Sequence, residues 1–161
     1  MPEQIELVVN GKARTTASAP GTPLLDVVRN EWLLMASRFG CGAESCGACM
    51  VLADGKPIYA CTTPIDALAG KTIITLEGLG DEAHPHPVQQ AFIELQAGQC
   101  GYCLSGIMIS AKALLDATPK PTRADIAAAL DKHLCRCGAH ARILRAVARA
   151  GELMAERGVD A

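Results

Sequence analysis

Eight cysteines in a chain of 161 residues constrain the fold of this sequence more than any other feature. They form two groups, one in each half of the chain: Cys41, Cys46, Cys49 and Cys61, then Cys100, Cys103, Cys135 and Cys137. Half of the residues are hydrophobic but only 3% are aromatic, so small and aliphatic side chains must fill the core. A core of this kind often needs covalent or metal cross-links, and the cysteines are the natural candidates.

Disulfide bonds and zinc are the two simplest uses of these cysteines. An even number fits disulfides, but the N-terminal sequence MPEQIELVVNGKART does not read as a secretory signal, and reducing compartments keep thiols reduced. A bond from Cys135 to Cys137 would also close a strained ring. Zinc sites made of cysteine pairs tend to repeat a two-residue gap. Here the gap from Cys41 to Cys46 is four residues, and Cys135 and Cys137 are separated by one residue.

The first group of cysteines fits an iron–sulfur cluster better. The spacing C-x4-C-x2-C from Cys41 to Cys49, with Cys61 further on, is typical of plant-type [2Fe–2S] proteins. Three glycines lie in this loop: Gly40, Gly42 and Gly47. They allow the backbone to turn tightly and to direct N–H groups at the sulfur atoms. The spacing and the glycines together predict a [2Fe–2S] site.

The second group has the pattern C-x2-C…C-x-C, which taken alone fits zinc or an iron–sulfur cluster. Beside the first site, a second [2Fe–2S] cluster is the favoured interpretation, and all eight thiols are then used. Cys100 and Cys103 are expected at the start of one helix, and Cys135 and Cys137 just before another. Both helix N-termini would then point at the metal and stabilise an anionic site, whichever metal it holds.

Hydrophobic periodicity predicts an α+β fold in two domains, residues 1–78 and residues 79–161. In the first, Asn10-Gly11 predicts a hairpin between two strands, and Thr22-Pro23 predicts the start of a helix. Three further strands are expected at 50–53, 57–61 and 72–76. After a linker at 81–87, helices are expected at 88–97, 101–117, 122–134 and 141–157, with Thr122 and Asp125 at the start of the third.

Charge and hydropathy exclude several classes of partner. The net charge is −2 without a block of lysine or arginine, so no nucleic-acid partner is expected. No apolar run reaches the roughly 18–20 residues of a membrane span. We expect a soluble, cytoplasmic protein, with inner-membrane association only through partners. His84 and His86 are expected to be solvated loop residues, and the four nearby cysteines make His133 and His140 unnecessary as ligands.

Three motifs give the chain a resemblance to a known family over nearly its whole length: GCGAESCGACMV, HPVQQAFIELQAGQCGYCLSGIMISAKALL and LCRCGAHARILRAV. They resemble the small iron–sulfur subunit of the molybdenum hydroxylases, which include xanthine dehydrogenase and aldehyde oxidoreductase. With TLEGLG, they are most similar to nicotinate dehydrogenase small subunits, and isoquinoline and aldehyde oxidoreductase small subunits are near neighbours.

The resemblance implies a β-grasp ferredoxin-like domain followed by a four-helix domain. The first cysteine group would hold an outer cluster, and the second an inner cluster beside a molybdopterin carried by a separate large subunit. Gln99 and Cys137 match the family's pterin contacts. The chain would be the electron-transfer subunit of an oxidoreductase, with no catalytic residue of its own. The acceptor would be a flavoprotein or a c-type cytochrome.

The resemblance also suggests the substrate of the complex, an N-heteroaromatic compound such as nicotinate, with an aldehyde or isoquinoline enzyme as the alternative. A zinc-stapled binding module and a free ferredoxin are the alternatives from other classes. The sequence departs from the family at Glu44, where glycine is common, and at Met50 and Ala139, where threonine is common. Glu44 places a negative charge near an anionic cluster, which is expected to lower the potential of that cluster.

Overall fold

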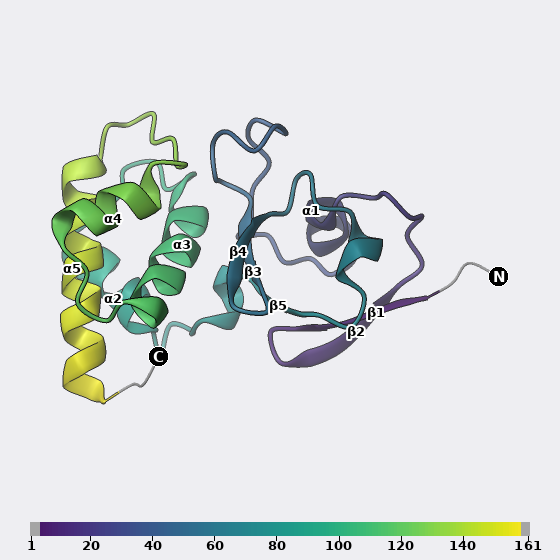
Figure 1. The fold of residues 1–161 in the computed structure, drawn as a ribbon, viewed down its shortest axis with the longest axis horizontal. Helices are drawn as coiled ribbons and strands as arrows, with labels where there is room; N and C mark the ends of the chain where they lie inside the picture. Colours follow the sequence, from purple (N-terminus) through teal and green to yellow (C-terminus); the bar gives the residue numbers. More distant parts are fainter. Residues whose placement is uncertain (1–3, 159–161) are drawn as a thin grey trace.

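The computed structural model describes residues 4–158 and shows an α+β protein in which a sheet and a group of helices lie side by side (Figure 1). The predicted fold class is therefore confirmed. The sheet has five strands in the order β2-β1-β5-β3-β4. Their bounds are β1 Ile5–Val9, β2 Lys12–Thr16, β3 Met50–Ala53, β4 Lys56–Tyr59 and β5 Thr72–Ile74. β1 pairs with β5 in parallel and the other pairs are antiparallel, so the sheet is mixed.

The first hairpin forms where Asn-Gly predicted it. Asn10 and Gly11 have φ angles of 50° and 75°, the left-handed pair that a two-residue hairpin turn requires. In β1 every second residue is buried, because the side chains of Ile5, Leu7 and Val9 face the core of this half.

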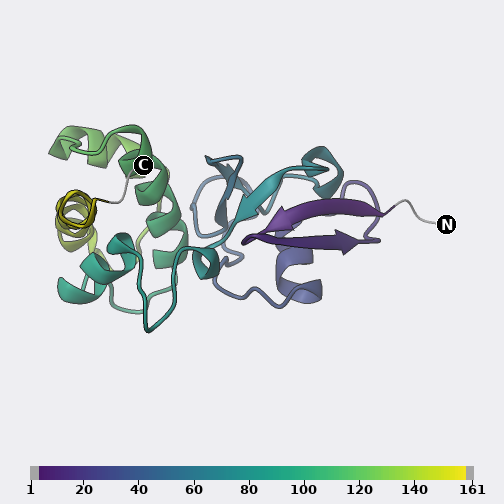
Figure 2. The same ribbon diagram turned by 90° about the horizontal axis from the view of Figure 1, so that it is seen from below.

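A helical segment follows Pro23, but its form differs from the prediction of a regular helix. The short helix α1, Leu24–Asp26, continues as a π-helix over Val27–Glu31, and the N–H of Trp32 bonds the carbonyl of Val27 at 3.1 Å. The segment buries apolar residues in the same core as β1, and Figure 2 shows it beside the β1–β2 hairpin. Two 3₁₀ turns, Ile65–Leu68 and Leu76–Gly78, flank β5.

The second half contains α2 Pro87–Glu94, α3 Leu104–Ala117, α4 Arg123–Leu130 and α5 His140–Arg157. These helices share an apolar core of their own, made mainly of alanine, leucine, isoleucine and valine. α3 begins three residues later than predicted and α4 ends four residues earlier. The cysteines of the second group therefore lie in loops next to helix ends. None of the helices within residues 4–158 is long and apolar enough to cross a membrane.

Two helix caps show where the sequence reasoning was right and where it was wrong. Thr122 and Asp125 form the predicted cap of α4, each side chain accepting a backbone N–H of the other. His86 was expected in solvent, but it is half-buried and caps α2, its Nδ1 accepting the N–H of Val88 at 3.2 Å. Burial, with the nearby charge of Lys112, lowers the pKa of His86 to about 4. His84 is exposed, as expected.

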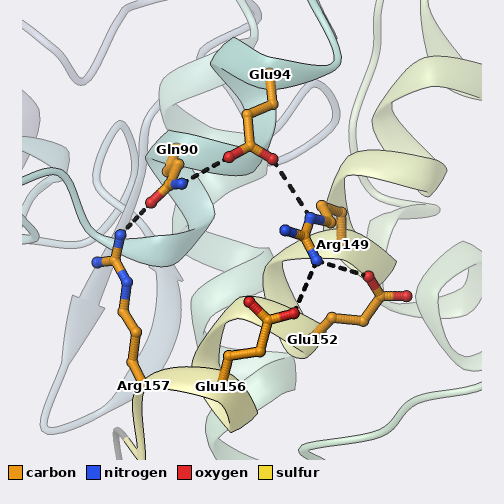
Figure 3. Close-up of polar contacts among 6 residues, drawn as sticks. All are labelled: Gln90, Glu94, Arg149, Glu152, Glu156 and Arg157. Atoms are coloured by element: carbon orange, nitrogen blue, oxygen red, sulfur yellow. Dashed lines mark hydrogen bonds and ion pairs between the residues drawn. The ribbon is translucent and has the colours of Figure 1, made fainter.

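A network of polar side chains joins the outer surfaces of α2 and α5 (Figure 3). Its members are Gln90, Glu94, Arg149, Glu152, Glu156 and Arg157. Arg149 lies at its centre, 3.4 Å from Glu94, 3.0 Å from Glu152 and 3.1 Å from Glu156. Exposed ion pairs of this kind are each worth about 0–1 kcal/mol, so the apolar contacts between the two helices dominate their packing.

The two halves meet where α3 lies against β3. Ile109 of α3 is fully buried with Met50 and Leu52 of β3. Gly106, also on α3, lies so close to Gly47 that a Cβ at position 106 would be 1.9 Å from the Gly47 carbonyl oxygen. This close approach places the loop of the first cysteine group directly against the helix that follows Cys103.

Candidate metal centres

The first cysteine group lies in the loop before β3, with Cys61 just after β4. Gly42 and Gly47 have φ angles of 65° and 72°, so the glycines supply the left-handed turns that the loop needs. The backbone N–H groups of Ala43 and Ser45 donate to Cys41 Sγ at 3.3 and 3.2 Å. These two bonds are the main reason why the pKa of the Cys41 thiol is lowered to about 7. The loop therefore directs N–H groups at a sulfur atom, as its glycines predict.

The four thiols of this group lie in two pairs. Cys41 is within hydrogen-bond reach of Cys46, and Cys49 is within reach of Cys61. Cys49 is only 1% exposed, and burial raises the pKa of its thiol to about 12. A buried thiol of this kind ionises when a metal binds it.

The second group is also arranged in two pairs, although its members come from two distant segments. Cys100 pairs with Cys137 and Cys103 pairs with Cys135. Cys103 is the residue that precedes α3, and burial raises the pKa of its thiol to about 12. Cys100 is exposed, and the backbone N–H of Tyr102, then the Cys137 thiol, lower its pKa. The structure thus brings together the four cysteines that the sequence assigned to one site.

Paired thiols suit the donor set of a binuclear cluster. In a [2Fe–2S] cluster held by four cysteines, each iron takes two thiolates. All eight cysteines are free, and in residues 4–158 no three Cys, His, Asp or Glu side chains converge on a point where one metal ion would bind. The residues present, four thiol pairs with backbone N–H groups at their sulfur atoms, fit two such clusters.

One cavity of about 330 Å³ touches both cysteine groups. Its walls include six of the eight cysteines: Cys41, Cys46, Cys100, Cys103, Cys135 and Cys137. The rest of the lining is made of Gly40, Ala48, Tyr102, Leu134 and Arg136. The side chains of Tyr102 and Leu134 are largely exposed. The two candidate centres are therefore neighbours across the meeting of the two halves.

Comparison with known proteins agrees with this arrangement. Residues 7–72 match the family described as "2Fe-2S iron-sulfur cluster binding domain", and residues 75–148 match "[2Fe-2S] binding domain". A nicotinate dehydrogenase subunit of Pseudomonas putida is 51% identical over 94% of this chain and 97% of its own length. The alpha subunit of isoquinoline 1-oxidoreductase from Brevundimonas diminuta is 45% identical over 92% and 97%. The chain belongs to the family of small [2Fe–2S] subunits of molybdenum hydroxylases.

Solved structures show the same fold. Quinoline 2-oxidoreductase from Pseudomonas putida 86 superposes on this iron–sulfur subunit with a TM-score of 0.91 and 32% identity, over 97% of both chains. The aldehyde oxidoreductase from Desulfovibrio desulfuricans ATCC 27774 also gives a TM-score of 0.91, with 40% identity over 97% of this chain. The match spans only 17% of that longer protein.

The structure also brings together Gln99 and Cys137, the two predicted pterin contacts of the iron–sulfur subunit. The exposed side chain of Gln99 donates from Nε2 to the carbonyl oxygen of Cys137 at 3.4 Å. Gln99 does not cap α3, because Cys103 occupies the N-cap of that helix and no side chain bonds there. Gln99 instead links the two segments that carry the second cysteine group.

His133 is the only buried histidine among residues 4–158. It is 8% exposed, its Nε2 lies 2.7 Å from Ser110 Oγ, and burial lowers its pKa to about 4. Its ring packs against Gly47 of the first cysteine loop, where a Cβ would be 2.2 Å from Nδ1. His133 thus packs between the first cysteine loop, at Gly47, and α3, at Ser110. His140, the first residue of α5, is exposed.

Sequence reasoning missed the residues that join the two cysteine loops. Arg38, three residues before Cys41, reaches the loop of Cys100, and the hydroxyl of Tyr102 donates to the carbonyl of Phe39. The signal in the sequence was weak: one basic residue before the first loop and one aromatic residue inside C-x2-C. Only the tertiary fold shows that they meet.

Proposed function

We propose that this chain is the electron-transfer subunit of a molybdopterin-dependent hydroxylase or dehydrogenase. It takes electrons from the molybdenum centre of a large partner protein and passes them through two [2Fe–2S] clusters to an external acceptor. The observation that carries the proposal is the shared cavity, which is lined by Cys41 and Cys46 of the first group and by all four cysteines of the second. Two one-electron carriers in adjacent sites match a reaction that releases two electrons at once.

The cysteine ligands are part of this proposal. Cys41, Cys46, Cys49 and Cys61 hold the outer cluster, and Cys100, Cys103, Cys135 and Cys137 hold the inner one. The two buried pairs, Cys49 with Cys61 and Cys103 with Cys135, anchor each cluster to the core.

We place the domain boundary between residues 78 and 79, after the 3₁₀ turn that ends at Gly78, because each side has a separate apolar core.

The aldehyde oxidoreductases support the existence of a large partner. In the protein from Megalodesulfovibrio gigas the region that matches this chain, at 37% identity, is only 16% of the total length. The remainder, including the molybdopterin site, would here belong to a separate polypeptide that contacts Gln99 and Cys137. The acceptor, a flavoprotein or a c-type cytochrome, would dock nearer the outer cluster.

The relatives favour an N-heteroaromatic substrate such as nicotinate. Four of them carry nicotinate, isoquinoline or quinoline in their names. An aldehyde is the second candidate, because the aldehyde oxidoreductase iron–sulfur-binding subunit PaoA of Escherichia coli is 37% identical. The complex that co-purifies with this chain should be assayed with nicotinate and with an aromatic aldehyde, and the higher kcat/KM decides between them.

The metal content of the purified chain tests the central assignment. We expect four irons and four acid-labile sulfides per chain, and two distinguishable EPR signals after reduction, because the thiols form two complete sets. Metal analysis, sulfide assay and EPR spectroscopy of the same sample measure this. Stoichiometric zinc without labile sulfide would show that the chain is a zinc-binding module instead.

Replacing Gln99 by Ala tests the contact with the pterin. The amide of Gln99 both donates and accepts hydrogen bonds, which suits a pterin edge better than a carboxylate does. We expect Gln99→Ala to keep both clusters and to slow the reduction of the inner cluster by substrate on the order of tenfold, as loss of an outer-shell contact does. Rapid mixing of the intact complex with substrate, followed by visible absorbance, measures that rate.

Gln99→Glu is the matched variant, because it keeps the size of the side chain and loses its two N–H donors. If hydrogen-bond donation by the Gln99 amide matters, Gln99→Glu should also slow the reduction of the inner cluster by substrate. Wild-type rates in both variants would show that Gln99 does not serve the electron route.

A further inference from the structure

The two cysteine loops are joined by one arginine and one tyrosine. The backbone N–H of Arg38 donates to the carbonyl of Ala48 at 3.0 Å, which ties Arg38 to the first loop. Its Nη1 donates to the carbonyl of Gly101 at 2.6 Å, in the loop between Cys100 and Cys103. The guanidinium also lies over the ring of Tyr102, 5.3 Å from its centre.

The contact is reciprocal. Tyr102, from the second loop, donates its hydroxyl hydrogen to the carbonyl of Phe39 in the segment that leads into the first loop. Each loop therefore holds a backbone carbonyl of the other through a side chain of its own. Tyr102 also lines the cavity that both cysteine groups share. We call Arg38 and Tyr102, with these four contacts, the inter-loop clasp.

The charge of Arg38 is directed at the second cysteine group. Its guanidinium is half-buried and bonds the residue next to Cys100, so water screens it less than it screens an exposed charge. Tyr102, over whose ring the guanidinium lies, lines the same cavity as all four cysteines of the second group. A cation held beside a cluster stabilises that cluster more strongly once it has gained an electron, because the added negative charge is attracted to the cation.

We propose that the inter-loop clasp fixes the spacing between the two clusters, and that Arg38 raises the reduction potential of the inner one. Arg38 and Tyr102 are positioning residues, since neither of them would bind iron. The inference rests on the proposed function, because it requires a [2Fe–2S] cluster in each cysteine group. A separate hydrogen bond, 3.1 Å from the Leu134 N–H to the Cys46 carbonyl, also joins the two cysteine segments. It should keep them in contact when the inter-loop clasp is altered.

Redox titration of the intact complex, followed by EPR spectroscopy, tests the role of charge. We expect Arg38→Gln to lower the potential of the inner cluster, so that at a fixed potential its ratio of reduced to oxidised form falls on the order of tenfold. The outer cluster should shift less. Arg38→Lys keeps the charge and should stay near the wild type. Arg123→Gln removes an exposed charge at the start of α4 and controls for net charge.

The magnetic interaction between the two reduced clusters tests the role in spacing. Tyr102→Leu removes the ring and the hydroxyl, and should reduce and broaden the splitting of the EPR signals. Tyr102→Phe keeps the ring under Arg38 and should change the splitting less. Both effects are independent of turnover, and a purely structural role would not produce the charge dependence at position 38.

The outcomes separate this inference from the proposed function. A wild-type complex without four irons and four sulfides contradicts the proposed function itself. A complete set of clusters, with the Arg38→Gln potentials and the Tyr102→Leu splitting both as in the wild type, overturns the clasp alone. Equal potentials in Arg38→Lys and Arg38→Gln, both below the wild type, would overturn the role of charge. If Arg38→Gln does not retain both clusters, the inner-cluster potential of Arg38→Lys tests the role of charge: a value near the wild type supports it and a lowered value overturns it. Tyr102→Leu still tests the spacing through the splitting of the EPR signals.

Discussion

Replacing Cys49 by Ser is expected to remove the outer cluster and to reduce steady-state turnover with an external acceptor by more than the roughly 10–100-fold typical of outer-shell changes. Cys49 is 1% exposed, so neither water nor a neighbouring side chain can easily take the place of its sulfur. A serine oxygen is a poorer ligand than a thiolate for iron in such a cluster. Substrate should still reduce the molybdenum centre once, since that step precedes the outer cluster.

Three measurements on one complex check this expectation: iron per chain, the single-turnover reduction, and the steady-state rate. Iron should fall from four to two per chain. Ser45→Ala is the matched control, because Ser45 lies in the same loop and its hydroxyl only bonds the carbonyl of Ala43 at 2.9 Å. Its backbone N–H to Cys41 is kept. Wild-type turnover in Cys49→Ser with two irons per chain would mean that electrons leave without passing the outer cluster.

Local sequence signals predicted most of the fold correctly. The Asn10-Gly11 turn, the alternation in β1 and the caps at Thr122 and Asp125 are short-range features, and each appears in the structure. The predicted helices failed mainly at their ends. The helix expected from residue 101 begins at Leu104, because Gly101 has a φ angle of 79°, which a right-handed helix cannot contain. Apolar periodicity continues through such positions and does not report the turn.

The π-helix and the cap at His86 had no reliable signal in the sequence. A period of 3.6 residues does not distinguish a regular helix from one that widens at Val27. Histidine is an unusual N-cap, and its burial depends on the packing of α2 against the rest of the helical half. Both features arise from tertiary contacts.

In the candidate metal centres, too, local features were predictable from the sequence and tertiary contacts were not. Cysteine spacing is a local property, and it assigned the eight thiols to two groups; in the structure each thiol lies beside another of its own group. Which thiols pair, such as Cys100 with Cys137, depends on how distant loops fold together. The contact of Arg38 with Gly101 spans 63 residues of sequence, so no local pattern could predict it.

Replacing Gly106 by Ala is expected to lower the stability of the protein, because α3 packs closely on the first cysteine loop at this residue. Alanine favours a helix over glycine by about 1 kcal/mol. Its Cβ, however, would lie 1.9 Å from the carbonyl oxygen of Gly47, and backbone cannot rotate aside as a side chain can. The same oxygen accepts the N–H of Met50 at 3.1 Å in the turn into β3. Overpacking of this kind typically costs about 1–3 kcal/mol, and a backbone clash lies at the upper end.

The gain in helix propensity offsets part of this cost and leaves a net loss of about 2 kcal/mol. We therefore expect Gly106→Ala to lower the midpoint of thermal unfolding by about 4–8 °C, since 1 kcal/mol corresponds to about 2–4 °C in a chain of this size. Iron should be lost mainly from the outer cluster, because Gly47 lies between Cys46 and Cys49. Gly151→Ala is the matched control: it is also a helix glycine, but its Cβ would be 3.1 Å from Leu115 and from the Pro119 carbonyl. There the gain in helix propensity offsets the tighter contact, and the midpoint should change by less than about 3 °C. Equal midpoints and equal iron content in Gly106→Ala and wild type would show that the two halves separate easily at this contact, and that α3 does not hold the first cysteine loop in place.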